Sequence, residues 1–399
     1  MKNLRPKYHK FLTMLFGVVL FSCIESFDTT FVDFESVLVV EAIITDIPKF
    51  QKINVSRSYE FNAEPIPELN ANVSVVDSDG NIYLFADSGN GSYISMESFG
   101  VEQGIQYQLL LSTSDGNRYR SDAEQLQVGN AKILNVDAKR MVNEKGEDGI
   151  VILVDSFDPM GNSKNYRFEY EETYHIIAPL WSPLELAPVN DEGCEMRLVP
   201  NISNEQNCFP TSLSKDILLT STEYLSQDRV ENFQIRFINR NDYIISHRYS
   251  ILVRQLIQSD QAFEFYNILL ELSSSESLLS QVQPGFLQGN IFSVDNSEEH
   301  VLGLFDLNTI DEERIFFNYN DFYPEEELPP FLDPCIGTAP PIESANRCLV
   351  RTLIESGAGI YAGSSGPDLV PGPYRIVPRI CGDCKVLGPA EPPNFWIEG

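Results

Sequence analysis

Residues 71–85, ANVSVVDSDGNIYLF, decide the fold class of this chain. Apolar and polar residues alternate on both sides of a turn around Gly80, which is the pattern of two antiparallel strands joined in a hairpin. The turn tetrapeptide SDGN recurs at 114–117. Asp and Asn tolerate the left-handed backbone, and Gly adopts it without steric cost. Both copies therefore predict turns, and the first lacks the later Glu that a calcium loop requires.

Further short strands are expected around this hairpin, at 37–45, 51–58, 91–95, 106–112 and 118–120. About seven short strands within residues 36–130 predict an immunoglobulin-like β-sandwich. The chain is therefore expected to be mostly β, beginning with this sandwich.

Residues 131–399 predict a second, larger β-rich domain with one main helix. Strands are expected at 149–155, 166–177, 233–239, 249–257 and 289–294. A hairpin is expected between 301–308 and 314–319. The helix is expected near 259–273, because Ser259 or Asp260 can cap it and apolar residues recur on one face. The Pro- and Cys-rich tail from Tyr323 is expected to wrap this domain rather than form its own.

Composition excludes two broad classes of protein. Hydrophobic residues make up 43% of the 399 residues and aromatics 11%, which supplies a core and excludes general disorder. Lys and Arg number 28 against 58 Asp and Glu, giving a net charge of −30. A charge of that sign repels phosphate backbones, so nucleic acid is not an expected partner.

The first 22 residues have the order of a secretory signal peptide. A basic start is followed by FLTMLFGVVLFS (11–22), an apolar stretch too short to span a bilayer as a helix. It leads into LFSC (20–23), which resembles the lipobox of bacterial lipoproteins, where the Cys is acylated on sulfur and becomes the mature N-terminus. An ordinary secretory signal with a chance Cys is the alternative. We expect lipidation at Cys23, an acidic tether over 23–35, and anchoring to a membrane.

The other six cysteines suit an oxidising compartment. They are Cys194, Cys208, Cys335, Cys348, Cys381 and Cys384. An even number in an exported chain predicts disulfides. Only a short segment separates Cys194 from Cys208, so these two are expected to pair, and the pairing of the other four is left open. A zinc site and a redox CxxC at 381–384 are the alternatives, although nearby prolines prevent the helix that a redox site needs.

Motifs that carry chemistry are scarce. The chain has neither the HExxH of zinc proteases nor the GxSxG of hydrolases. His247 is expected to be a satisfied strand histidine, although 247–249 is also compatible with a polar site. The glycine-rich 357–363 is expected to be a surface loop, and the carboxylates of 171–172 and 325–327 are expected to be solvated. Trp396 is expected to pack the tail onto the domain, while Trp181 and Trp396 are the only candidate sugar platforms. No catalytic residue, metal or cofactor is expected.

Several segments together resemble a known family. They are VLVVEAIITD (37–46), the pattern DSDGNIY…GSY…QYQLLLSTSDGNRYRSD (77–122), YEET (170–173), PGFLQGNIFS (284–293), VLGLFDL (301–307) and CGDCKVLGPAEPPNFW (381–396). With the lipobox, they resemble the Bacteroidota outer-membrane lipoproteins grouped as domain-of-unknown-function family 4249. The N-terminal part is also similar to the transthyretin-like sandwiches that precede some outer-membrane receptors.

The resemblance implies a location but no reaction. It implies a lipid-anchored outer-membrane protein that is often encoded beside a TonB-dependent receptor. In some Bacteroidota, acidic residues after the lipidated Cys mark export to the cell surface, so a surface-facing orientation is expected. The resemblance assigns no catalytic residue. The sequence therefore predicts a non-catalytic binding or accessory module of a TonB-dependent receptor or another outer-membrane barrel. The alternative is a surface hydrolase acting on peptide or glycan through carboxylates that the sequence does not single out.

Overall fold

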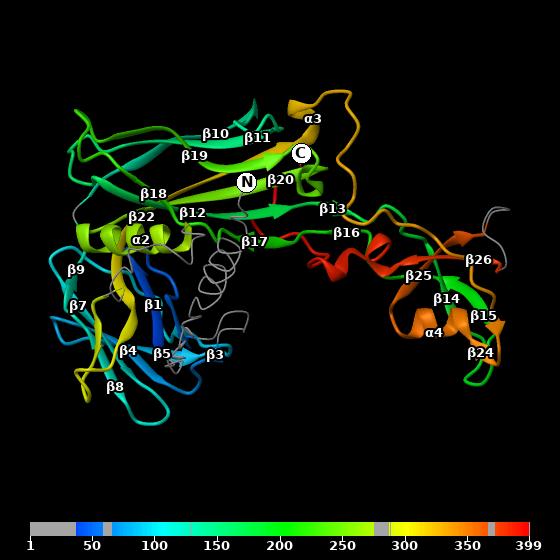
Figure 1. The fold of residues 1–399 in the computed structure, drawn as a ribbon, viewed down its shortest axis with the longest axis horizontal. Coiled ribbons are helices and arrows are strands. Elements are labelled where there is room, and N and C mark those ends of the chain that lie inside the picture. The colour runs from blue at the N-terminus through cyan, green and yellow to red at the C-terminus, as the bar shows by residue number, and fades with distance from the viewer. Residues whose placement is uncertain are drawn as a thin grey trace, which may run out of the picture.

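The computed structural model describes residues 37–58, 66–127, 129–274, 287, 289–365 and 372–398. The expected signal peptide, Cys23 and the tether over 23–35 lie outside the described residues. The chain is mostly β, as predicted, with 47% of the described residues in strands and 10% in helices. Among the described residues, no helix is long and apolar enough to cross a membrane. Figure 1 shows two modules packed together and a smaller lobe that projects from them.

The N-terminal module contains the strands expected before residue 130. They are β1 (Leu38–Thr45), β2 (Lys52–Arg57), β3 (Ile66–Pro67), β4 (Asn72–Asp77), β5 (Ile82–Asp87), β6 (Ser92–Ser95), β7 (Gln106–Ser112), β8 (Arg118–Ser121) and β9 (Glu124–Gln125). The opening hairpin is confirmed, since β4 and β5 pair antiparallel. Alternate residues of these strands point inward, and Val73, Val75 and Phe85 are buried in one core.

Two strands from far along the chain complete this module. β21 (Ile291–Ser293) pairs with β8, and the first part of β22 (Val301–Asn318) pairs parallel with β1. The sheet order therefore runs from β22 through β1 to β8 and β21. The side-chain amide of Asn290, which directly precedes β21, bonds to β22 at the other end of the sheet. Its Oδ1 accepts from Phe305 N and its Nδ2 donates to Phe305 O, both at 2.8 Å. Ile291 and Phe305 thereby enter the N-terminal core.

The central module is built from two facing sheets. One sheet contains β10 (Lys132–Val142), β11 (Asp148–Phe157) and β19 (Arg229–Asn239). The other contains β12 (Asn165–Tyr174), β20 (Arg248–Ile257) and the second part of β22, with β17 (Thr211–Leu213) and β18 (Leu218–Ser221) beside β12. The short helices η1 (Tyr243–Ile245) and α3 (Tyr319–Phe322) flank this sheet. Ile152 and Val154 from the first sheet share a core with Phe168 from the second.

The predicted hairpin between 301–308 and 314–319 is wrong, because both segments belong to the single strand β22. Residues 301–308 pair with β1, and residues 309–318 pair antiparallel with β20. The intervening Thr-Ile-Asp-Glu-Glu offers no glycine or asparagine for a tight turn, so the strand continues. At the crossing, Asp46 Oδ1 accepts a hydrogen bond from Ile310 N at 3.0 Å. One strand thus joins the N-terminal and central modules.

The main helix is confirmed as α2 (Asp260–Ser274). Ser259 caps it, since its Oγ accepts from Ala262 N at 3.1 Å. Phe265 and Tyr266 pack against Leu304 of β22, so the helix covers the sheet where the two modules meet, as Figure 1 shows.

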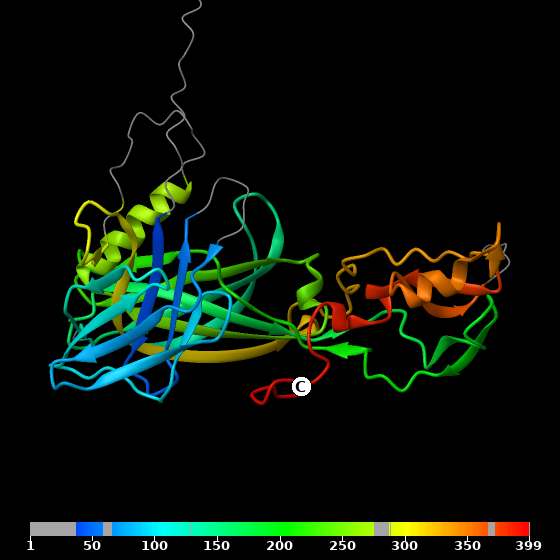
Figure 2. The ribbon, with the colours of Figure 1, turned by 90° about the horizontal axis from the view of Figure 1, so that it is seen from below.

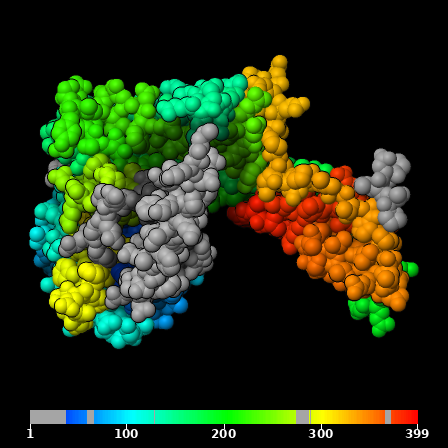
Figure 3. Space-filling view, viewed as in Figure 1, coloured from blue at the N-terminus to red at the C-terminus, as the bar shows by residue number. Residues whose placement is uncertain are grey.

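The tail does not wrap the central module as expected, but forms a lobe with the insertion after β12. The lobe contains β14 (Leu184–Pro188), β15 (Met196–Pro200), β23 (Glu343–Ser344), β24 (Arg347–Cys348), α4 (Leu349–Glu355), β25 (Gly359–Ser364) and β26 (Tyr374–Pro378). Met196 and Val350 share a separate core there. The glycine-rich segment expected as a loop instead pairs, as β25, with β26. Figures 2 and 3 show the lobe projecting beside the two modules.

All six cysteines outside the signal region form disulfides, but the predicted Cys194–Cys208 pair is wrong. The bonds are Cys194–Cys348, Cys208–Cys384 and Cys335–Cys381. Cys194 lies between the paired strands β14 and β15, whereas Cys208 lies in β16 (Asn207–Cys208), which pairs with β13 (Ile176–Ile177). The β14–β15 hairpin therefore separates the two cysteines, and each meets the tail instead. Together the three disulfides fix the lobe and its root.

Candidate functional site

The two SDGN turns serve the structure of the N-terminal module. In the first turn, Asp77 Oδ1 accepts from the backbone N–H groups of Asp79 and Asn81, and its Oδ2 accepts from Tyr83 OH. The turn's own donors thus occupy both carboxylate oxygens, in agreement with the expected turn chemistry.

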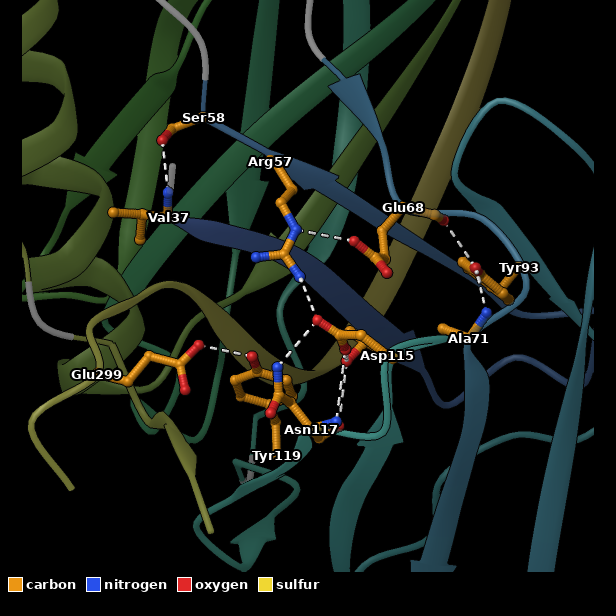
Figure 4. A network of polar contacts seen from close by, with 11 residues as sticks. Val37, Arg57, Ser58, Glu68, Ala71, Tyr93, Asp115, Asn117, Tyr119 and Glu299 are labelled. Carbon is orange, nitrogen blue, oxygen red and sulfur yellow. Dashed lines mark hydrogen bonds and ion pairs between the residues drawn. The ribbon is translucent and has the colours of Figure 1, made fainter. Parts of the chain in front are cut away.

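The second turn belongs to a polar network at one end of the module, which Figure 4 shows from close by. Arg57 Nε donates to Glu68 Oε2 at 2.9 Å, and Arg57 Nη2 lies 4.0 Å from Asp115 of the turn. Tyr119 OH donates to Glu299 Oε1 at 2.6 Å. The network joins β2, the second turn, β8 and the segment before β22. Each charged group in the network has a partner, so the network holds these four segments together.

The outer face of the same sheet exposes apolar side chains. Ile82 is 59% exposed, Leu84 54% and Met96 67%, and Met96 N donates to Leu84 O at 2.8 Å. We call these three residues the outer patch. Across the sheet, Ser74 pairs with Leu84 on one side and with Leu110 on the other. The patch therefore borders a shallow hollow of about 340 Å³ that Ser74 and Leu110 help to line.

A second hollow lies where the lobe joins the central module. It has a volume of about 360 Å³ and is lined by His175, Ser246, His247, Arg248, Asn318, Tyr319, Asn320, Leu328 and Glu398. Two histidines that are 72 positions apart in the sequence meet in it. His175 lies between β12 and β13, and its backbone N–H donates to the backbone oxygen of Arg248 at 2.8 Å. His247 lies between η1 and β20, and the ring centroids of the two histidines are 5.7 Å apart.

The two imidazoles have different surroundings. His175 stacks on Phe209, with ring centroids 5.0 Å apart, and its Nε2 lies 2.8 Å from Asn207 Oδ1. Burial, and then the neighbouring His175, lower the pKa of His247 from 6.5 to about 4. Within the described part of the chain, no hydrogen bond to the His247 ring is found, and the residue precedes β20. The expectation of a satisfied strand histidine stays a prediction.

The end of the tail closes one side of this histidine hollow. Trp396 packs edge-on against Phe209 and Phe316, with centroid distances of 5.1 and 5.8 Å. Arg248 Nε donates to Ile397 O at 2.5 Å. The expectation that Trp396 packs the tail onto the domain is confirmed. These contacts place Glu398, which follows Ile397, in the wall of the hollow.

The paired carboxylates are not solvated as expected. Glu171 Oε1 accepts from Arg314 Nη2 at 2.6 Å, and its Oε2 accepts from Arg254 Nη2 at 3.2 Å. Burial opposes ionisation of Glu171, but the two arginines prevail and lower its pKa. Glu172 is only 7% exposed and accepts from Tyr249 OH at 2.6 Å. Each carboxylate thus binds groups on neighbouring strands and stabilises the sheet.

In the tail triplet, Glu325 and Glu327 are exposed as expected, whereas Glu326 is half-buried and its Oε2 lies 2.5 Å from Arg240 Nη2. A third hollow, of about 410 Å³, contains only one carboxylate, that of Asp242. The histidine hollow contains only Glu398, and the hollow beside the outer patch contains none. Glycosidases use a facing pair of carboxylates, and none of these three hollows has one.

The alternatives considered for the cysteines find no support. Cys381 and Cys384 bond to different partners, so they do not form a redox CxxC pair. Among the described residues, one group of three metal-type side chains is close enough to share an ion, namely Asp333, Cys335 and Cys381. Its two sulfurs are bonded to each other, so neither is a free thiolate for zinc.

Sequence reasoning found His247 but missed its partner. His175 ends the long alternating segment 166–177, and nothing in the local pattern distinguishes it from a surface residue of that strand. Glu172 was missed for a related reason, because its burial depends on β19 and β20. Only the pairing of distant strands brings these groups together.

Comparison with known proteins gives a family but no activity. The family model described as "Domain of unknown function (DUF4249)" matches residues 24–314. The search of curated proteins found no match. Among solved structures, the chain is similar to a DUF4785 family protein from Legionella pneumophila, at 10% identity and a TM-score of 0.18. The match covers 54% of this chain and 51% of that chain, so this chain spans about half the length of that protein.

Proposed function

This chain belongs to the DUF4249 family, and we propose that it is an outer-membrane-anchored lipoprotein that binds an outer-membrane β-barrel protein, such as a TonB-dependent receptor, without catalysing a reaction. The observation that carries the proposal is the outer patch. Ile82, Leu84 and Met96 are each more than half exposed on a rigid, fully paired sheet. A preformed apolar face of this kind is suited to protein binding.

The tether supports a partner in the same membrane. Thirteen residues separate Cys23 from Val37, where the described structure begins, so the two are fourteen Cα-to-Cα steps apart. A fully extended chain of that length spans at most about 50 Å, since each residue contributes about 3.3–3.6 Å. An acylated Cys23 would therefore keep Val37, where the N-terminal module begins, within about 50 Å of the membrane surface. The net charge of −30 disfavours direct contact with anionic lipid, which leaves a membrane protein as the expected occupant.

The first test concerns the anchor. Cys23→Ala removes the sulfur that would carry the lipid, so the processed chain is expected to leave the membrane fraction. Fractionation followed by immunoblotting measures this release, with the wild-type chain as control. A Cys23→Ala chain that still sediments with outer membrane after a high-salt wash would show that the lipid is not the anchor.

The second test concerns the partner. The wild-type chain, expressed at its native level and solubilised in detergent, is expected to co-purify with a heat-modifiable barrel protein. Replacing Leu84 and Met96 together by Glu should lower the yield of that barrel at least tenfold, because it places charge in the apolar contact. Met160→Glu is the matched control, since Met160 is also 67% exposed but lies on the central module.

Two results would contradict the binding proposal. One is repeated recovery of the wild-type chain without any barrel. The other is an unchanged barrel yield in the Leu84→Glu/Met96→Glu chain, which would remove the outer patch from the interface. Circular dichroism of each variant separates lost binding from lost folding.

A further inference from the structure

We propose that the histidine hollow binds one divalent transition-metal ion, such as Zn²⁺, through His175 and His247, with water completing the coordination. The inference goes beyond the proposed partner binding, because the hollow lies at the root of the lobe and shares no residue with the outer patch. It rests on the distance between the two rings, on the contacts that orient His175 and on the hollow beside both rings.

The separation of the rings fits a shared ion. A zinc–nitrogen bond of about 2.0–2.1 Å places the metal roughly 3.2 Å from the centroid of each ligating imidazole. Two rings on one ion then have centroids about 5.2 Å apart at the tetrahedral angle, and about 5.7 Å apart if the angle opens to roughly 125°. The observed distance between the centroids of His175 and His247 is 5.7 Å.

Asn207 orients the imidazole of His175 as a metal ligand. An amide oxygen only accepts hydrogen bonds, so the 2.8 Å contact between Asn207 Oδ1 and His175 Nε2 places the proton on Nε2. Nδ1 of His175 therefore keeps its lone pair. Histidine ligands of metals usually donate their other N–H to an oxygen in this way, which fixes the tautomer and the ring orientation. Stacking on Phe209 further restricts rotation of the His175 ring.

His247 offers the second lone pair. The residue lines the hollow directly beside His175, and an uncharged imidazole is the form that binds metal. The hollow beside the rings measures about 360 Å³ and is open to solvent on one side, so water molecules can fill the remaining positions.

The charges around the hollow are compatible with a cation. Glu398 in its wall contributes a negative charge. The wall also holds Arg248, so one positive and one negative side chain line the hollow, and the guanidinium of Arg248 is hydrogen-bonded to neighbouring oxygens. Its Nε donates to Ile397 O, and its Nη1 donates to Asn318 Oδ1 at 3.3 Å. Two nitrogen ligands of this kind suit Zn²⁺, Cu²⁺ or Ni²⁺ better than Ca²⁺ or Mg²⁺, which prefer oxygen.

The test is metal binding by the full processed chain in detergent, purified without a histidine tag and treated with EDTA. Titration calorimetry with Zn²⁺ is expected to give one site per chain. His175→Ala and His247→Ala should each weaken binding at least tenfold. His300→Ala is the matched control and should bind as the wild type does. Asn207→Ala, which removes only the positioning contact, should weaken binding about 10- to 100-fold.

A second measurement uses the wild-type chain alone, in case a variant fails to fold. With histidines labelled at Cε1, Zn²⁺ should shift two of the three ring signals of the processed chain and leave the third in place. The proposal is overturned if the wild type binds no stoichiometric Zn²⁺ at 100 µM, a concentration about a hundredfold above a micromolar Kd. It is equally overturned if folded His175→Ala and His247→Ala chains keep wild-type affinity, or if no ring signal shifts.

Discussion

Replacing Gly303 by Ala is expected to destabilise the N-terminal module severely. Gly303 lies opposite Val40 in the parallel pairing of β22 with β1. Its φ is +153°, and an added Cβ would lie 2.0 Å from Val40 O and 2.8 Å from Val40 C. Both of these atoms belong to the backbone, so no side-chain rotation relieves the contact.

The magnitude follows from the displacement that is needed. Real Cβ contacts are ordinarily 3.4 Å or longer, so the two strands must separate by more than 1 Å at this point. The displaced pairing spans eight registered residue pairs and lies over the N-terminal core. We therefore expect a loss of about 4 kcal/mol or more, which places Gly303→Ala among the rare, most damaging single substitutions.

Gly80→Ala is the matched control. Gly80 also has a positive φ, +89°, but an added Cβ would meet nothing within 4 Å. Its cost is therefore the backbone strain alone, about 1–2 kcal/mol. Urea unfolding followed by circular dichroism compares the two variants with the wild type. The reasoning is refuted if the unfolding midpoint of Gly303→Ala falls no further than that of Gly80→Ala.

Three further outcomes are expected. Replacing Cys208 and Cys384 by Ala should cost about 2–5 kcal/mol, because the bond closes a separation of 176 residues, and trypsin should then cleave the lobe first; unchanged resistance would contradict this. Tyr249→Phe should cost about 1.5–3 kcal/mol in urea unfolding, since it removes the hydrogen bond to the buried Glu172 carboxylate. The folded pKa of His247, about 4, lies below its unfolded value of 6.5, so the unfolded state gains the proton first as the pH falls. The stability that uncharged His247 contributes is therefore complete above about pH 6.5 and is lost toward pH 4. In EDTA, the free energy of unfolding of the His247→Gln variant should fall less than that of the wild type between these two pH values.

Local pattern was enough to predict most of the strands. The alternation in 71–85 predicted β4, β5 and the turn between them, and the capped apolar face near 259–273 predicted α2. These elements depend on neighbours in sequence, where side-chain period and turn chemistry act directly. Their boundaries in the structure lie within a few residues of those expected.

The errors share a physical cause, which is pairing over long sequence distances. The segments 301–308 and 314–319 each have strand character, and the nearest antiparallel partner was the simplest choice. The structure instead pairs them with β1 and β20. Cys194 was likewise expected to bond with the nearest cysteine, but its partner lies 154 positions away. Side-chain periodicity carries no information about which distant segment becomes the partner.

The same long-range pairing determines how the candidate sites can work. The N-terminal module is incomplete without β21 and β22, which come after the central module in sequence, so the outer patch sits on a sheet that closes only when most of the chain is present. The histidine hollow depends on an even later segment, because Trp396 and Ile397 form contacts around it. Since residues near both ends of the described chain hold these surfaces in place, movement of the lobe would change the contacts around the hollow, whereas the outer patch lies on the N-terminal module, which Figure 1 shows apart from the lobe. A metal ion in the hollow would therefore act on the orientation of the lobe and leave the outer patch unchanged.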